Sequence, residues 1–350
     1  MSRSTVHRLL ATFLAASVFL LGQPDPAVHA RGQDVCPEPN DTFQTACYLG
    51  PASDAIGFIS RPDDIDAYRI EVLDFNVDVH AEISEMPFPY RLNLANWNGD
   101  LIATSSNQGG VEAIDTTVSV PGSYYIFVDS RTGQFSDSQP YRVFRQLTYP
   151  GSSIPQILYS GEFREGGGEG FTGSNDFADY SESGGKYTIA MKRSGTQDEG
   201  THAWSYWGPE FTDFTMTVDT RVVSGSPDPA YSGYTVFFRS HLGADYASST
   251  GYRVEVNSSG DVRLQKIDRG EVVNVTDWRS TSAASAVGGV NRTVIRCAGS
   301  DILINLNGYD VLHLNDRSFA SGRFGFGAAT WGEPVVVSFD NVIVTTPSEG

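Results

Sequence analysis

The chain has 350 residues and a formal net charge of −18 at pH 7. So large an excess of acidic groups repels phosphate backbones, which argues against nucleic-acid binding. Gly, Ser, Thr, Val, Tyr and Phe are abundant, whereas long periodic stretches of Ala, Leu, Glu and Lys are missing. This composition indicates strands and turns, and hence an all-β protein.

Residues 1–30 have the parts of a secretory signal peptide. Arg3 and Arg8 give a positive start, an apolar run covers residues 9–21, and small residues precede position 31. A membrane-spanning helix needs about 20 apolar residues, so this run is too short for one, and the stop-transfer residues of an uncleaved anchor are missing. We expect cleavage after Ala30 and a soluble mature chain, not inserted in the membrane, that is secreted, periplasmic or on the cell surface.

Short strand-like runs separated by turn signals fill residues 34–148. They alternate apolar and polar residues, as a half-buried strand does, and Asn98-Gly99 is a strong hairpin signal. Prolines and a glycine within residues 149–157 then indicate a linker. The strand-like runs before it are 67–72, 77–83, 91–97, 123–128 and 141–144.

Residues 158–346 continue in the same way, with a second hairpin signal at Asn307-Gly308. Neither block contains an amphipathic pattern of helix length. Short strands at regular spacing are typical of sandwiches, so we predict two β-sandwich (jelly-roll) domains in series. The strand-like runs of the second block are 187–192, 211–223, 234–239, 252–257, 261–267, 293–297, 302–306, 324–328 and 335–344.

Three cysteines follow the signal segment. Cys36 and Cys47 flank a short acidic segment, and an exported protein meets an oxidising compartment, so we predict a disulfide between them. Cys297 alternates with Thr293 and Ile295 in a strand pattern. A buried, unreactive thiol is the interpretation we favour for Cys297, with a reactive thiol as the alternative.

The first block contains two groups of oxygen-bearing side chains, about 20 residues apart in the sequence, that flank its first strand. The first is Glu38-Pro39-Asn40-Asp41 and the second is Asp63-Asp64-Ile65-Asp66. Hard cations such as calcium take six to eight oxygen ligands at short range, and a cation would relieve the repulsion between carboxylates held close together. The spacing therefore allows a calcium site, with a solvated acidic turn as the alternative.

The first block resembles the bacterial pre-peptidase C-terminal domain, through the segments EPNDT, GFIS, DDIDAYRIEV, LANWNGDLIATS, PGSYYIFVDS and PYRVF. That family is a small β-sandwich attached to secreted peptidases and is similar to the collagen-binding domain of clostridial collagenases. The resemblance covers residues 34–148 and implies a calcium site. By position, its ligands are Glu38, Asn40, Asp41, Asp64 and Asp66, with Asp63 as a substitute for either later aspartate.

Two further features of this resemblance concern single residues. Collagenase members carry an acidic residue two positions before the EPN motif, where this chain has Cys36, which implies a site with one ligand fewer. Tyr124, Tyr125 and Tyr141 fall where the collagen-binding domains carry aromatic strands. We expect these tyrosines to point into the core, since half of a strand's side chains must face inward.

The second block is similar to concanavalin A-like, laminin-G-like jelly rolls, including keto-disaccharide hydrolase-like domains. The segments that carry this resemblance are GGKYTIAM, WSYWGPEFTDFTMTVDTRVV, SGYTVFFRS, TGYRVEVNSSGDVRLQK, NRTVIRCAGSDILINLNGYDVLHLNDRSFASGRFGFGAAT and VSFDNVIV. It covers residues 158–346 and implies the jelly-roll fold. This fold hosts enzymes, lectins and spacers, so it does not imply one function.

No catalytic constellation can be recognised in the sequence. Retaining glycosidases hold two carboxylates about 5–5.5 Å apart, and laminarinase-type enzymes place them on one strand as Glu-x-Asp-x-Glu, which is missing here. Glu210 and Asp213 are three residues apart and so face opposite sides of a strand. Glu255 stands alone in an alternating strand, and Asp340-Asn341 is interpreted as a turn or ladder anchor. A non-catalytic domain is the expectation.

Tryptophan and tyrosine residues are the candidates for ligand contact in the second block. Trp331 lies in a turn-like Thr-Trp-Gly-Glu-Pro segment and is the first candidate, followed by Trp204 and Tyr206, which alternate and so share a face. Trp278 is a further candidate. The alternative is that these rings belong to the core, where aromatic residues dominate.

The sequence thus predicts an exported, calcium-stabilised, non-catalytic binding or adhesion protein that recognises a carbohydrate or an extracellular protein. A secreted carbohydrate-active enzyme using the second domain is the first alternative. A structural spacer or sensor ectodomain is the second.

Overall fold

The computed structural model of the protein describes residues 34–50, 54–107, 110–151, 153–161, 163, 170–197, 200–241 and 248–347. The predicted signal peptide, residues 1–30, lies outside the described residues. Apart from one 3-10 turn at Pro229–Tyr231, the regular elements that the structure describes are strands. None of the described helices is long and apolar enough to cross a membrane.

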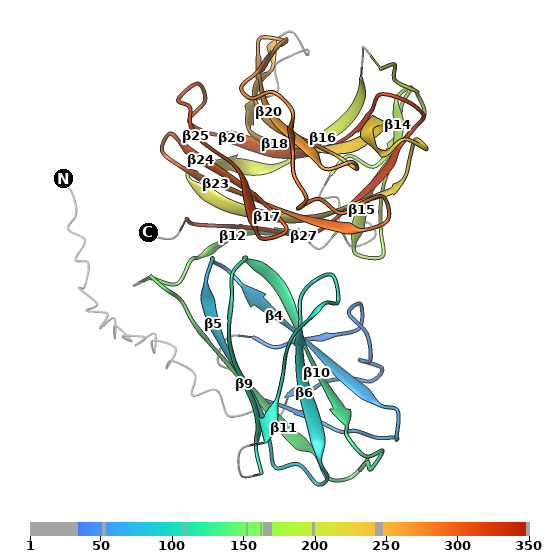
Figure 1. Cartoon of the computed structure of the whole chain (residues 1–350), viewed down its shortest axis with the longest axis vertical. Coiled ribbons are helices and arrows are strands. Elements are labelled where there is room, and N and C mark those ends of the chain that lie inside the picture. The colour runs from blue at the N-terminus through green and yellow to red at the C-terminus, as the bar shows by residue number, and fades with distance from the viewer. Residues whose placement is uncertain are drawn as a thin grey trace, which may run out of the picture.

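The first domain is a sandwich of two sheets (Figure 1). Its apolar core lies between them, and side chains of β4 alternate inward as predicted, with Tyr68, Ile70 and Val72 buried. One sheet has the order β1 (Asp34–Val35), β3 (Ala55–Gly57), β11 (Tyr141–Thr148), β5 (Val77–Ser84), β9 (Glu112–Val118), β8 (Ser106–Asn107). The other has the order β2 (Cys47–Tyr48), β4 (Ile65–Val72), β10 (Gly122–Ser130), β6 (Tyr90–Ala95), β7 (Leu101–Thr104).

The second domain is a larger sandwich with its own core. A nine-stranded sheet has the order β13 (Gly173–Ser174), β14 (Ala178–Ser183), β15 (Lys186–Met191), β27 (Val336–Thr345), β17 (Phe214–Ser224), β23 (Val290–Ala298), β24 (Asp301–Leu306), β25 (Tyr309–Asn315), and β12 (Ile157–Gly161) also pairs with β27. A seven-stranded sheet has the order β16 (Thr201–Phe211), β26 (Gly322–Thr330), β18 (Ser232–His241), β19 (Thr250–Asn257), β20 (Asp261–Asp268), β21 (Glu271–Asn274), and β22 (Arg279–Ser280) pairs with β20. The predicted fold of two β-sandwich domains in series is confirmed.

The two sheets of the second domain face different surroundings. Strands β12, β17 and β27 of the nine-stranded sheet lie against the first domain, whereas the seven-stranded sheet lies on the far side of the sandwich (Figure 1). Each sheet turns one face to the core between them, because side chains alternate along a strand. The seven-stranded sheet therefore has an outer face directed away from the first domain.

Local predictions at the turns and cysteines are also confirmed. Asn307 and Gly308 have φ values of 51° and 94° and join β24 to β25 directly, as a two-residue hairpin turn with positive φ requires. Cys36 and Cys47 form a disulfide. Cys297 is free and buried, and burial raises the pKa of its thiol to about 12.

Candidate functional site

An acidic corner of the first domain brings together part of the expected calcium-ligand set. Carboxylate oxygens of Glu38, Asp64 and Asp66 all lie within 4.8 Å of one another, with Glu38 exposed and both aspartates buried. Burial raises the pKa of Asp66 to about 7, and the charges of Glu38 and Asp64 add to this shift, although Tyr141 donates a hydrogen bond to the same carboxylate. Negative charges are thus held close together at this corner.

Several polar atoms of this corner lack a well-formed hydrogen bond. They are both side-chain polar atoms of Asn40 and one carboxylate oxygen in each of Asp41 and Asp66, all of them buried. Buried polar groups in proteins are nearly always hydrogen-bonded or bound to a metal. Oxygen atoms left in this state are the ligands that a hard cation prefers, so the residues fit a calcium ion.

Arg61 supplies a positive charge at the same corner that the sequence analysis did not consider. Its guanidinium lies 2.6 Å from Asp41 Oδ2, 3.0 Å from Asp64 Oδ1 and 3.3 Å from Asp63 Oδ1. The hydrogen bond with Asp41, followed by the charge of Asp64, raises the pKa of Arg61. Asp41, Asp63 and Asp64 are therefore all engaged by Arg61, and Asp63, with a side chain 86% exposed, lies apart from the three grouped carboxylates.

The three tyrosines compared with collagen-binding residues take two different positions. Tyr124 and Tyr141 are in the core, where the Tyr141 hydroxyl contacts both Tyr68 and Asp66. Tyr125 points the other way, onto the outer face of its sheet, where Phe43 packs edge-on against it with 4.6 Å between ring centroids. The core interpretation is wrong for Tyr125, because the second domain and Phe43 bury it from outside the sandwich.

The second candidate site lies on the outer face of the seven-stranded sheet. Strand register places Trp204, Gly327, Thr235, Glu255 and Arg263 in one row across five adjacent strands. Their neighbours along each strand face the core, so this row is on the opposite face. The core interpretation is therefore wrong for Trp204, which is half-buried on the outer face. Tyr206 follows it in β16, but its side chain lies outside the described residues.

Glu255 is the centre of a charged network on this face and is not an isolated acid. His202 Nε2 lies 2.7 Å from one of its carboxylate oxygens, Arg263 Nε donates to the other at 2.6 Å, and Arg253 lies 3.2 Å away. Burial alone would raise the pKa of Glu255, but the hydrogen bond with His202 and the charge of Arg253 outweigh burial and lower it to about 2. The carboxylate is fully buried and fixes the orientation of all three partners.

Two tryptophans border this network. The guanidinium of Arg263 lies 4.2 Å from the ring centroid of Trp278, and the Trp278 and Trp331 rings meet edge to face at 5.7 Å. Trp331 also packs edge to face against His202 at 5.9 Å. Trp331 is half-buried, and Trp278, 37% exposed, is the more accessible ring. The residues missed from sequence were His202, Arg253 and Arg263. Arg253 and Arg263 belong to the β19–β20 pair that carries Glu255, whereas His202 joins them from β16, which is distant in the chain.

The acidic residues Glu210 and Asp213, singled out in the sequence, each lie beside a basic side chain. Glu210 lies 3.7 Å from His241, whereas Asp213 pairs with Arg239 at 3.2 Å. Asp340 lies inside β27 opposite Asp219 of β17, and Asn341 follows it at an irregularity in this pairing. The structure agrees with the ladder alternative of this interpretation and not with the turn alternative, since both residues belong to a central strand.

Comparison with known proteins places the second domain in a family. The 3-keto-alpha-glucoside-1,2-lyase-like domain matches residues 164–345, which is more than half of the chain. The protein therefore belongs to this family, as the keto-disaccharide hydrolase-like resemblance of the second block implied. The comparison with curated protein sequences finds no match.

Three solved structures to which the chain is similar can be compared with it. The carbohydrate-binding module CBM66 from Bacillus subtilis is 20% identical, with a TM-score of 0.39 over 51% of this chain and 96% of its own. A GlcNAcα1-4Gal-releasing endo-β-galactosidase from Clostridium perfringens is 7% identical, with a TM-score of 0.43 over 58% of this chain and 66% of its own. The pre-peptidase C-terminal domain of collagenase from Bacillus anthracis is 16% identical, with a TM-score of 0.25 over 29% of this chain and 94% of its own.

Proposed function

We propose that the protein is an exported binding protein whose second domain recognises a carbohydrate on the outer face of the seven-stranded sheet. The observation that carries this proposal is the accessible Trp278 ring, which lies beside Arg263 and Trp331. Arg263 and His202, the neighbour of Trp331, are both held in place by the buried Glu255. A sugar ring has an apolar face that stacks on tryptophan and a hydroxyl edge that takes hydrogen bonds. Fixed donors next to an aromatic ring match both features.

Two further observations support the proposal. The family to which the second domain belongs is named for a lyase acting on a 3-keto-alpha-glucoside, which is a carbohydrate. The Cys36–Cys47 disulfide fits an oxidising compartment, as a secreted, periplasmic or cell-surface protein would meet. The carbohydrate is our choice of ligand over an extracellular protein, because the fixed polar network beside the tryptophans suits hydroxyl groups.

In the experiment the full chain is titrated with a panel of oligosaccharides and polysaccharides. Calorimetry measures binding, and a chemical assay for new reducing ends measures cleavage. Heat of binding without product release is the expected result. If no carbohydrate binds and a matrix protein does, the ligand of this site is a protein and the carbohydrate proposal is wrong.

A second candidate function is an elimination on a 3-keto glucoside, and the His202–Glu255 pair favours it. A buried carboxylate that orients a histidine is a recurrent arrangement for a general base. The C3 ketone of such a sugar acidifies the proton on C2. His202 would take that proton, the C–H electron pair would form a C1–C2 double bond, and the C1–O bond would break with its electrons leaving on the oxygen. Product release from a 3-keto glucoside that is lost in His202→Asn would establish this activity.

We also propose that the acidic corner binds calcium and stabilises the first domain. Glu38, Asn40, Asp64 and Asp66 would hold the ion through their side-chain oxygens, while Arg61 neutralises Asp41. A ligand at about a hundredfold excess over its dissociation constant stabilises a fold by about 2.7 kcal/mol. Calcium should therefore raise the unfolding temperature relative to chelator, Glu38→Gln should reduce this rise, and the control Asp63→Asn should keep it. A melting curve indifferent to calcium and chelator would refute the site.

A further inference from the structure

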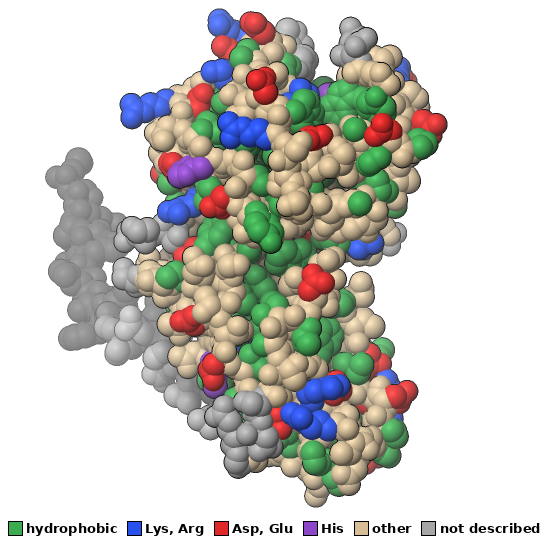
Figure 2. All heavy atoms as spheres, in the orientation of Figure 1, with side chains coloured by type: hydrophobic (Ala, Val, Ile, Leu, Met, Phe, Trp, Pro, Cys, Tyr) green, Lys and Arg blue, Asp and Glu red, His purple; other side chains and the backbone are tan. Residues whose placement is uncertain are grey.

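A cavity of about 510 Å³ separates the two domains. It is lined by β4 and β10 of the first domain and by β12, β17 and β27 of the second, together with the loops beside them. Hydrophobic side chains and a few charged ones lie along this junction in Figure 2. The volume falls within the range of about 300–1,000 Å³ that is usual for small-molecule sites, which often occur between domains.

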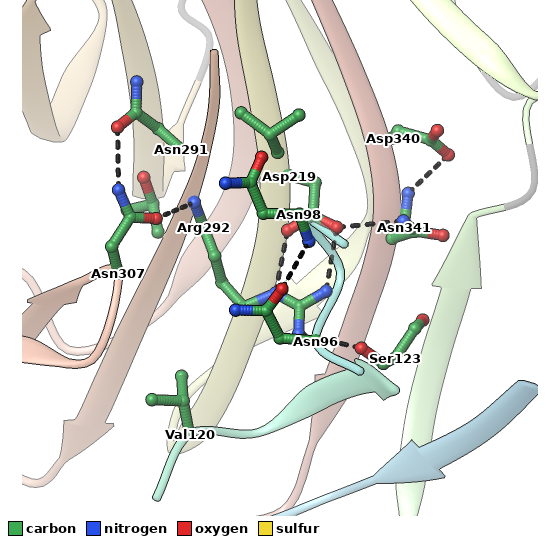
Figure 3. Close-up of polar contacts among 12 residues, drawn as sticks. Asn96, Asn98, Val120, Ser123, Asp219, Asn291, Arg292, Asn307, Asp340 and Asn341 are labelled. Atoms are coloured by element: carbon green, nitrogen blue, oxygen red, sulfur yellow. Dashed lines mark hydrogen bonds and ion pairs between the residues drawn. The ribbon is translucent and has the colours of Figure 1, made fainter. Parts of the chain in front are cut away.

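The walls of this cavity are fixed by one buried arginine. Arg292 of β23 makes two 2.8 Å contacts with the Asp219 carboxylate and donates to the backbone oxygen of Ser123 in the first domain (Figure 3). Its guanidinium also lies 3.8 Å from the ring centroid of Trp97 in the first domain. Asn341 completes the arrangement by donating to Asp219 at 2.9 Å.

The backbone of the first domain allows this close approach. A Cβ atom at Gly122, where φ is 128°, would lie 2.3 Å from Arg292 Nη1, so only glycine fits there. A second contact joins Val120 to the hairpin turn of the second domain, since a Cβ at Gly308 would lie 3.2 Å from the valine methyl group. The cavity is therefore formed in advance of any ligand and is more than a gap between loosely joined domains.

The two walls differ in chemistry. Aromatic rings of Phe43, Trp97 and Tyr125 line the side of the first domain. On the side of the second domain the lining includes the polar Ser160 and Asp340 and the Gly184-Gly185 turn, together with apolar side chains of β23 and β27. Aromatic rings next to hydrogen-bonding groups suit a ligand with an apolar face and a hydroxyl edge.

The charges of the lining balance. The lining carries three basic side chains, Arg69, Lys186 and Arg221, and three acidic ones, Glu71, Asp219 and Asp340. Arg69 lies 3.2 Å from Glu71, and Asp219 is held by Arg292 from outside the lining. A site for an anion or a cation carries an excess of the opposite sign, whereas equal numbers of donors and acceptors suit a neutral polyhydroxylated molecule. Asp340 lines the cavity, and its Oδ1 accepts a hydrogen bond from the backbone N–H of Asn341 at 2.8 Å. Its carboxylate can therefore accept further hydrogen bonds from a ligand in the cavity.

We propose that this cavity is a binding site for a neutral mono- or disaccharide, held by residues of both domains. The site is distinct from the outer face of the seven-stranded sheet, which lies on the other side of the second domain (Figure 1). A short sugar could therefore be held between the domains whether or not the outer face binds a glycan.

The test uses the full chain and the indole N–H signals of its tryptophans in NMR spectra. Trp97 reports on the cavity, while Trp278 and Trp331 report on the outer face, and Trp→Phe variants assign the signals. Glucose, galactose, mannose, sucrose, maltose and cellobiose are the probes. We expect at least one of them to shift the Trp97 signal in a saturable manner.

Variants then tie this shift to the cavity. Ser160 is exposed and lines the cavity, so Ser160→Trp should fill the space and abolish the shift. His313→Trp, at an exposed position of β25 outside the lining, is the control and should retain it. Asp340→Asn should weaken binding roughly tenfold, as loss of a charged hydrogen-bond partner does.

Two results would overturn the proposal. One is that no probe shifts the Trp97 signal, and the other is that the shift persists in Ser160→Trp or is unchanged in Asp340→Asn. Thermal unfolding of each variant checks that it folds. Shifts of the Trp278 and Trp331 signals are read separately, so failure of the cavity proposal and failure of the proposed function are distinguishable.

Discussion

Asp340 is expected to destabilise the folded protein at neutral pH, so that replacing it should stabilise the fold. Burial is the largest cause that raises the pKa of this carboxyl from 3.8 to about 6, and the negative charge of Asp219 is the second. The positive charges of Lys186 and Arg69 act in the opposite direction. A raised acid pKa means that the folded state binds the proton more tightly than the unfolded state does. Stability is then lost as the pH rises from about 4 to about 6.

The size of the effect follows from this shift. One pKa unit corresponds to about 1.4 kcal/mol, so a shift of about two units amounts to roughly 3 kcal/mol as an upper limit. Asp340→Asn keeps the shape of the neutral carboxyl and its Oδ1 acceptor for the Asn341 amide. At pH 7 the variant should gain about 1–3 kcal/mol, or on the order of 2–4 °C in unfolding temperature for each kcal/mol in a domain of this size.

Thermal unfolding by calorimetry at pH 4 and pH 7 measures this prediction. The variant and the natural protein should unfold at similar temperatures at pH 4, where Asp340 is protonated in the folded state, and should separate at pH 7. A variant that is less stable at pH 7, or a difference that is equal at both pH values, would refute the reasoning.

Three further predictions concern single interactions. Asp219→Ala leaves Arg292 buried without its partner and should cost about 3–5 kcal/mol in chemical denaturation, whereas the exposed-pair control Asp268→Ala should cost at most about 1 kcal/mol. Replacing both Cys36 and Cys47 by alanine should cost about 2–3 kcal/mol through loop entropy, and an unchanged denaturation midpoint would contradict this. The Cys297 thiol, buried and with its pKa raised to about 12, should react with a thiol reagent only after unfolding, and fast labelling of the native protein would show that it is accessible.

Much of the fold could be predicted because a strand pattern is local. Alternation of apolar residues indicated strands such as β4. The Asn307-Gly308 pair indicated the hairpin between β24 and β25, since only certain residues tolerate positive φ. The disulfide followed from the export context and from two nearby cysteines. The acidic corner could be indicated in part, because its two groups of residues flank short neighbouring elements.

The rest depended on pairings that no local pattern contains. His202 meets Glu255 only because β16, β26, β18 and β19 are adjacent in one sheet, and the sequence separates these two residues by 53 positions. Arg61 stood outside the ligand motif, so its role at the acidic corner could not be read from that motif. Arg292 alternates with core residues of β23, and the strand pattern alone cannot show that its outer face meets Trp97 of another domain.

The central claim is that the outer face of the seven-stranded sheet binds carbohydrate through Trp278. Its most direct test is the affinity of Trp278→Ala, measured by calorimetry with whichever glycan of the panel binds the natural protein, beside the control Tyr309→Ala. Tyr309 is 67% exposed on β25, and its loss removes a comparable aromatic ring far from the site. Loss of an aromatic anchor commonly costs about 2 kcal/mol or more, so we predict that Trp278→Ala binds at least about 30-fold more weakly while Tyr309→Ala binds as the natural protein does. Equal affinity of Trp278→Ala and the natural protein would contradict the account.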